Sequence, residues 1–189
     1  FISFSLATFT AAFLVVRLRA RVSRAHIGRY SFLLVAAGLT LLGATIRNDW
    51  SNAMVMLGMA VAGFGEGALV TLLFNVLVTA SPRELAGDVG SVRGVTNNLA
   101  TAVGTALAAA LLVTLLERSV HYELIHNASL PDELTAQIDL DDISFIGNDR
   151  LQEVLAGTTA TPEQVAEAVQ INTNARLLAL KVTFFGLAG

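Results

Sequence analysis

The sequence predicts an all-α fold, a polytopic bundle of transmembrane helices, and its composition and apolar patterning both support this. Of the 189 residues, 54% are hydrophobic and 14% are charged, whereas about 25% charged residues is usual in soluble domains. A helix of about 20 apolar residues crosses the hydrocarbon core of a bilayer. Each apolar run is therefore expected to be all or part of a span, and the five runs cover residues 1–16, 30–46, 53–80, 95–116 and 177–189.

The two ends of the chain are expected to be cuts through helices. The first run lacks the basic start of a secretory signal, so it is interpreted as a span. The chain begins at Phe1 rather than Met and stops at Gly189 inside an apolar run. We therefore expect a fragment whose last segment, 176–189, is the start of a truncated final span.

Arginine is distributed unevenly between the two sides of the runs. The loop at about 17–29 holds five Arg and no acid, and a second loop at about 81–94 holds two more, against three on the other side, Arg47, Arg118 and Arg150. Because Lys and Arg are retained on the cytoplasmic face, we expect both loops inside and the segment 117–175 outside. The predicted location is a multi-pass position in the cell membrane, such as the bacterial inner membrane.

The segment 117–175 is strongly acidic, with eleven Asp and Glu against two Arg. It is interpreted either as a solvated loop or as a source of negative potential that concentrates cationic solutes. Thr161, Pro162 and Gln164 supply a cap, a proline at the first helical position and a capping-box partner. They predict a helix start that leads into the last run, and the apolar residues near Leu151 and Leu155 predict a short amphipathic helix before it.

The third run carries a carboxylate near its middle. A charge at the bilayer centre costs about 2.5–3.5 kcal/mol on insertion scales, so Glu66 is expected to face a cavity or a partner helix. It is a candidate for proton coupling, or alternatively a structural group hydrogen-bonded between helices. Gly63 and Gly67 have the spacing of small residues in packed membrane helices, and Gly65 lies between them. These glycines predict close packing or bending.

Two polar stripes follow at helical spacing. The third run contains Thr71, Asn75 and Thr79, and the fourth contains a second stripe beside a face with Gly104. Such stripes line a solute path or hydrogen-bond to a neighbouring helix. Because Asn75 lies about half a turn around the helix from Glu66, a straight helix cannot place both in one cavity. The second stripe consists of Asn97, Thr101 and Thr105.

Several classes of function are not supported by the sequence. There is no phosphate-binding glycine loop, no Ser, His and Asp set in one segment and no pair of carboxylates inside a run, so we expect neither an ATP-driven machine nor an enzyme. The absence of Cys and the scatter of His26, His121 and His126 predict no metal site. No cofactor is expected. The arginine-rich loop is interpreted as a topology signal or a contact with anionic lipid, rather than as a nucleic-acid site.

The order of these parts resembles the C-terminal half of a major facilitator superfamily transporter. The most specific likeness covers residues 81–108, where a Ser-Pro-Arg-Glu helix start, expected to be a short inner-face helix and hinge, leads through Gly90 to Gly94 into a span with Asn97, Asn98 and Gly104. The long outer segment before the final run is similar to that of the fourteen-helix drug/proton antiporter branch.

The resemblance extends in part to the first inner loop. Leu18, Arg21 and Arg24 occupy the leucine and basic places of the family's loop motif, whereas Val16 and Ser23 replace its glycines and Ala20 replaces its acid. By resemblance, these arginines and Arg93 would latch or orient the inner face.

The resemblance implies a secondary active transporter that exports drugs or other lipophilic or cationic small molecules in exchange for protons. Glu66 would contact the proton or cation, and Asn75, Asn97 and Thr101 would line the cavity. The expected partners are the solute, protons and the lipid bilayer, and the full-length protein is expected to be monomeric. Two alternatives remain: a symporter or facilitator for another small solute, and a membrane sensor whose acidic outer segment binds a ligand.

Overall fold

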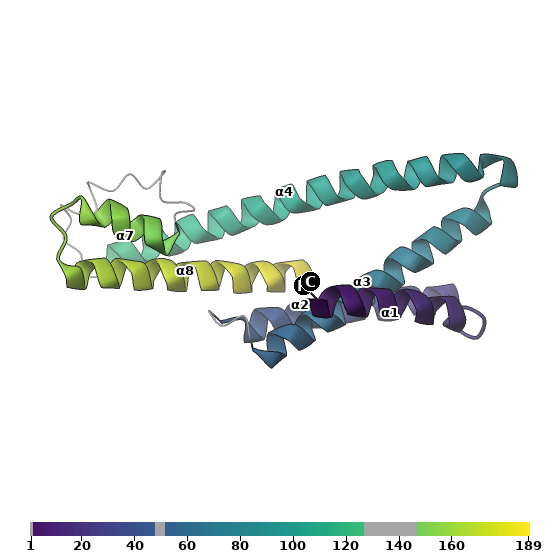
Figure 1. Ribbon diagram of the computed structural model, residues 1–189, viewed down its shortest axis with the longest axis horizontal. Coiled ribbons are helices and arrows are strands. Elements are labelled where there is room, and N and C mark those ends of the chain that lie inside the picture. Colours follow the sequence, from purple (N-terminus) through teal and green to yellow (C-terminus); the bar gives the residue numbers. More distant parts are fainter. Residues whose placement is uncertain (1, 48–51, 127–146) are drawn as a thin grey trace. The chain divides into compact units, whose positions relative to one another are not determined.

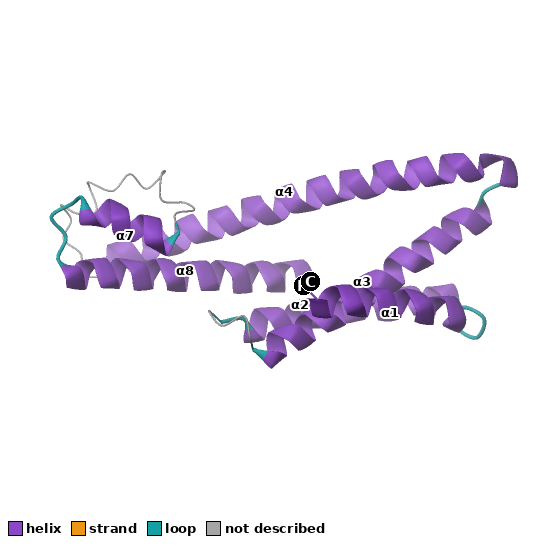
Figure 2. Ribbon diagram, viewed as in Figure 1, coloured by secondary structure: helices purple, strands orange, loops and turns teal. Residues whose placement is uncertain are grey.

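Every regular element that the structure describes is a helix (Figures 1 and 2), as the sequence predicts. The computed structural model describes residues 2–47, 52–126 and 147–189. Residues 1–106 with 184–189 form one unit, and residues 107–183 form a second. In chain order the elements are α1 (Ile2–Leu18), α2 (Arg24–Thr45), α3 (Ala53–Ala80), a short 3₁₀ helix η1 (Arg83–Leu85), α4 (Ala86–His126), α7 (Asn148–Ala156) and α8 (Pro162–Ala188).

Three of the described helices are long and apolar enough to cross a membrane, namely α2, α3 and the part of α4 from Gly87 to Ser119. They correspond to the second, third and fourth apolar runs, and they indicate a membrane protein. The first run forms α1, which is apolar but only 17 residues long. The fifth run is the C-terminal half of α8, a continuous helix of 27 residues. Its assignment as a final span stays a prediction.

In the first unit, α3 packs against both α1 and α2. A buried cluster joins the three helices through Ala11 and Val15 of α1, Ile27 of α2, and Ala68 and Leu72 of α3. Most of these side chains are small, so the helix backbones approach closely. Without a strong hydrophobic drive between helices in lipid, such close contact is the main source of attraction between them.

In the second unit, α8 packs against α4 and is hydrogen-bonded to α7. Leu116 of α4 is buried with Ala175 and Ala179 of α8. On α7, Leu151 and Leu155 are buried while the residues between them are exposed, which is the pattern of an amphipathic helix on an apolar surface. Side-chain hydrogen bonds between α7 and α8 accompany this burial.

The helix starts predicted within the segment 117–175 are confirmed. The short helix α7 covers the amphipathic stretch, and α8 begins at Pro162. The Thr161 amide donates to the Gln164 side-chain oxygen at 2.9 Å, and the Gln164 amide donates to the Thr161 hydroxyl at 3.3 Å. This is the reciprocal capping box that the sequence indicates. Residues 127–146, which carry five of the segment's acids, lie outside the described residues.

Parts of both loops predicted at about 17–29 and 81–94 are helical. Only residues 19–23 separate α1 from α2, with Ser23 as the N-cap of α2. In the segment 81–94, the short helix η1 lies where a short helix is predicted, whereas no hinge separates Ala86 from Arg93, because α4 runs unbroken from Ala86. The position of η1 on the inner face stays a prediction. Ser81, the expected cap of that helix, instead donates its hydroxyl to the Leu77 carbonyl at 2.9 Å and closes α3. Glycines are common in membrane helices, and those at 87, 90 and 94 do not interrupt α4.

Candidate solute-binding groove

An open groove of about 760 Å³ lies within the first unit, between α1, α3 and the N-terminal turns of α4. Its volume falls in the range of roughly 300–1,000 Å³ that is typical of small-molecule sites. The lining combines one acid, one base, amides and hydroxyls with aromatic and small apolar residues. It consists of Phe4, Ser5, Thr8, Phe9, Ala12, Glu66, Gly67, Val70, Thr71, Gly90, Arg93, Gly94, Asn97 and Asn98.

Glu66 is directed into this groove by the glycine packing of α3. A Cβ added to Gly63 would lie 2.6 Å from the Phe4 carbonyl oxygen, and one added to Gly67 would collide with the backbone of Thr8. Both glycines therefore face α1. A Cβ added to Gly65 would lie 2.7 Å from the Ser31 carbonyl oxygen on α2. With successive residues about 100° apart, the carboxylate of Glu66 is left beside α1, where it lines the groove and is exposed.

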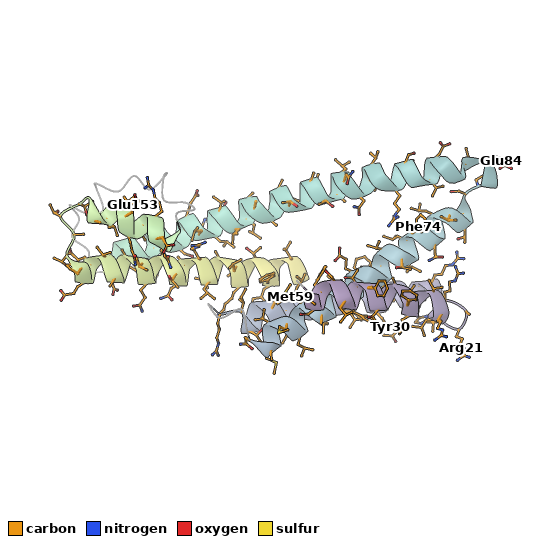
Figure 3. All side chains as sticks on the ribbon, in the orientation of Figure 1. Arg21, Tyr30, Met59, Phe74, Glu84 and Glu153 are labelled. Carbon is orange, nitrogen blue, oxygen red and sulfur yellow. The ribbon has the colours of Figure 1, made fainter. Side chains whose placement is uncertain are left out.

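The groove carries one charge of each sign, Glu66 and Arg93. Among the described side chains, these two form no ion pair with each other. The Arg93 guanidinium instead lies over the ring of Phe74, with 4.6 Å from its central carbon to the ring centroid; Figure 3 labels Phe74 on α3. Such a cation–π contact contributes about 0.5–1 kcal/mol at an exposed site. The carboxylate is thus accessible to another cation.

Of the four candidate cavity residues, Glu66 and Asn97 line the groove, whereas Asn75 and Thr101 do not. The Asn75 side-chain oxygen accepts a hydrogen bond from Arg19 at 2.7 Å, and its amide donates to the Thr71 carbonyl at 2.9 Å. This arrangement agrees with the half-turn separation of Asn75 from Glu66. Thr101 lies one turn beyond Asn97 on α4 and is exposed.

The polar contribution of α1 was missed by the sequence analysis. Ser5 and Thr8 line the groove, and the Thr8 hydroxyl donates to two carbonyls at 3.0 Å, those of Phe4 in its own helix and Gly63 in α3. Ser5, Thr8 and Ala12 recur at three- and four-residue steps, so they mark one helical face of small and hydroxyl residues. That spacing is the signal in the sequence from which this polar face of α1 could have been predicted.

The residues assigned by resemblance to the loop motif lie outside the groove, apart from Arg93. Leu18 is the last residue of α1, and Arg21 and Arg24 are exposed on either side of the start of α2. Figure 3 shows Arg21 at this turn. Gly104, grouped by sequence with the packing glycines, has nothing within 4 Å of an added Cβ, so it differs from Gly63, Gly65 and Gly67.

No group of three His, Asp or Glu side chains in the described ranges is placed to hold a metal ion. The groove offers Glu66 for the binding of cations or protons, Arg93 for anions, and the amides of Asn97 and Asn98 for neutral polar groups. Comparison with known proteins gives no relative: no family model, curated protein or solved structure matches the chain.

Proposed function

We propose that the chain is part of a secondary active transporter of the major facilitator type. It exports drugs or other lipophilic or cationic small molecules across the cell membrane in exchange for protons. The observation that carries this proposal is the position of Glu66, an acid on a membrane-length helix that faces an open groove lined by Arg93, Asn97 and Asn98.

A carboxylate in this position suits exchange chemistry. An intramembrane acid is costly unless it meets a partner or water, and Glu66 can be neutralised either by a proton or by a cationic solute. The two occupants compete for one charge, so uptake of a proton favours release of the solute. Phe4 and Phe9 supply aromatic walls in the same groove, and aromatic faces attract organic cations.

Alternating access would follow from a change in the position of the helix bundle that contains α1 to α3 relative to a second bundle, as in transporters that rock around a fixed site. The glycine contacts of α3 with α1 and α2 keep these three helices together as one body. The contact of Arg93 with Phe74 joins α3 to α4 through a single pair of side chains. It is therefore weaker than the glycine packing of α3 against α1 and α2.

The proposal is tested by efflux of a fluorescent lipophilic cation from vesicles that contain the full-length protein, driven by a proton gradient. Glu66→Gln removes the charge with little change in size, and it is expected to abolish gradient-driven efflux while membrane insertion is retained. Glu84→Gln is the matched control, because Glu84 lies in η1 outside the groove, and its efflux should equal that of the unmodified protein.

Unchanged efflux by Glu66→Gln would remove Glu66 from the mechanism. Absence of gradient-dependent efflux from the unmodified protein would refute export of lipophilic cations. Uptake that increases with an inward proton gradient would then favour the symporter alternative.

A further inference from the structure

A second groove in the first unit differs from the first in being almost wholly apolar. It has a volume of about 740 Å³ and is lined by Ala12, Phe13, Leu14, Val16, Arg17 and Thr71. Phe13, Leu14 and Val16 are exposed, at 65%, 44% and 49%. The groove therefore presents an apolar wall along α1 with one permanent positive charge, Arg17, in the last turn of that helix.

Arg17 belongs to a group of exposed arginines in a segment that contains no acid. Residues 17–29 include five arginines and neither Asp nor Glu, and all five side chains are exposed. Arg19 donates to Asn75. Within the part of the chain that the structure describes, the side chains of Arg17, Arg21 and Arg24 have no hydrogen-bond or ion-pair partner in the protein. The group thus offers uncompensated positive charge at the end of an apolar groove.

We infer that this groove binds one anionic phospholipid. An acyl chain lies along Phe13, Leu14 and Val16, and the phosphate group is held by Arg17 with Arg21 close by in the chain. The combination identifies the occupant by its chemistry, because a lipid with an anionic head is apolar along its length and negative at one end. A nucleic acid or an acidic peptide would satisfy the arginines but would leave the apolar wall uncovered.

The site also agrees with the expected topology. The arginine-rich loop is expected on the cytoplasmic face, where anionic lipids give the leaflet a negative surface potential and each nearby Lys or Arg contributes about 1 kcal/mol to attraction. Single-residue contributions of that size correspond to roughly five-fold changes in affinity. The inference depends neither on the transported solute nor on the direction of transport.

The test is retention of phosphatidylglycerol by the purified protein, counted by native mass spectrometry against phosphatidylcholine of the same acyl chains. We expect preferential retention of phosphatidylglycerol, and a roughly five-fold loss of its affinity in Arg17→Gln. Arg17→Lys keeps the charge and should retain most of the binding. Arg150→Gln is the matched control, because Arg150 is an exposed arginine on α7 that pairs with Glu153; it should bind as the unmodified protein does.

A second variant separates the groove from the charge. Val16→Trp adds bulk to the apolar wall without changing the charge, so it should weaken phosphatidylglycerol retention. Arg17→Gln should still lower retention when it is combined with Val16→Trp. Soluble glycerol 3-phosphate should not compete, since it has no acyl chain. Equal retention of the two lipids, unchanged retention by Arg17→Gln or Val16→Trp, or competition by glycerol 3-phosphate would each overturn the proposal.

Discussion

The two units of this protein hold their helices together in different ways. In the first unit, α3 meets α1 and α2 through glycines whose added Cβ atoms would overlap neighbouring backbone, and its buried cluster consists mainly of Ala and Val with Ile and Leu. In the second unit, a hydrogen-bonded group of two asparagines and a threonine joins α7 to α8. Two leucines of α7 are buried, and the start of α8 carries a complete capping box.

The difference indicates whether each region is adapted to lipid or to water. In lipid, moving an apolar side chain from the acyl chains into a helix contact is little favoured, because both environments are apolar. Helices there associate by close backbone contact through small residues. In water, leucine burial, caps and amphipathic faces stabilise helices. The first unit follows the lipid pattern, whereas α7 and the N-terminal half of α8 follow the aqueous one, which suits the outer segment predicted from the charge distribution.

The largest expected effect is on the glycine packing of the first unit. In the double variant Gly63→Leu with Gly67→Leu, side chains would overlap the α1 backbone at Phe4 and Thr8. Overpacking a single site typically costs about 1–3 kcal/mol, and here the obstacle is backbone at two successive turns. We expect loss of monodisperse protein in detergent, measured by size-exclusion chromatography and thermal unfolding.

The control for this variant is Gly104→Leu, because a Cβ at Gly104 meets nothing within 4 Å. It should leave the elution profile and the unfolding midpoint unchanged. Normal yield and stability of the Gly63 and Gly67 double variant would show that α1 does not lie against α3 as described, and the contrast between the two units would be lost.

The second prediction concerns the hydrogen-bonded group of the other unit. Asn148 accepts from the Asn172 amide at 2.8 Å and donates to the Thr173 hydroxyl at 2.9 Å, and Asn172 is buried. Asn148→Ala removes both hydrogen bonds, and an intramolecular hydrogen bond contributes about 0.5–1.5 kcal/mol to stability. We expect a lower denaturant midpoint for the loss of α7 and α8 helicity, measured by circular dichroism or hydrogen exchange.

Gln152→Ala is the matched change on the exposed side of α7 and should have little effect on the midpoint. If Asn148→Ala were equally mild, the asparagine contacts would not stabilise the pairing of α7 with α8.

The sequence predicts the fold better than it predicts the groove, for a physical reason. Long apolar runs determine helix position, and the pattern from Thr161 to Gln164 determines a helix start, because both are local. Which polar residues share a groove depends on how helices are rotated against each other. Asn97 lines the same groove as Glu66, whereas Asn75 bonds to Arg19. Ser5 and Thr8 enter the groove from α1, whose polar residues were not predicted to line a cavity. Ser81 fits the pattern of an N-cap, yet its hydroxyl donates to the Leu77 carbonyl in the last turn of α3.

The smallest expected effect tests the polar contact that crosses the first unit. The Thr8 hydroxyl donates to the Gly63 carbonyl of α3 and also to the Phe4 carbonyl of its own helix. Thr8→Val keeps the shape and removes the donor. Hydrogen bonds between membrane helices contribute about 0.6 kcal/mol on average, and the freed Gly63 carbonyl retains its place in the α3 backbone, so the unfolding midpoint in detergent should fall only slightly.

Thr10→Val provides the comparison, because the Thr10 hydroxyl donates to Leu6 within α1 and contacts no other helix through this bond. Its stability should be unchanged within error, and the difference between the two variants isolates the contribution of the bond to α3. A loss in Thr8→Val as large as that in Asn148→Ala would mean that polar contacts stabilise both units to the same degree. Close glycine packing would then no longer suffice to explain how α1 is held on α3.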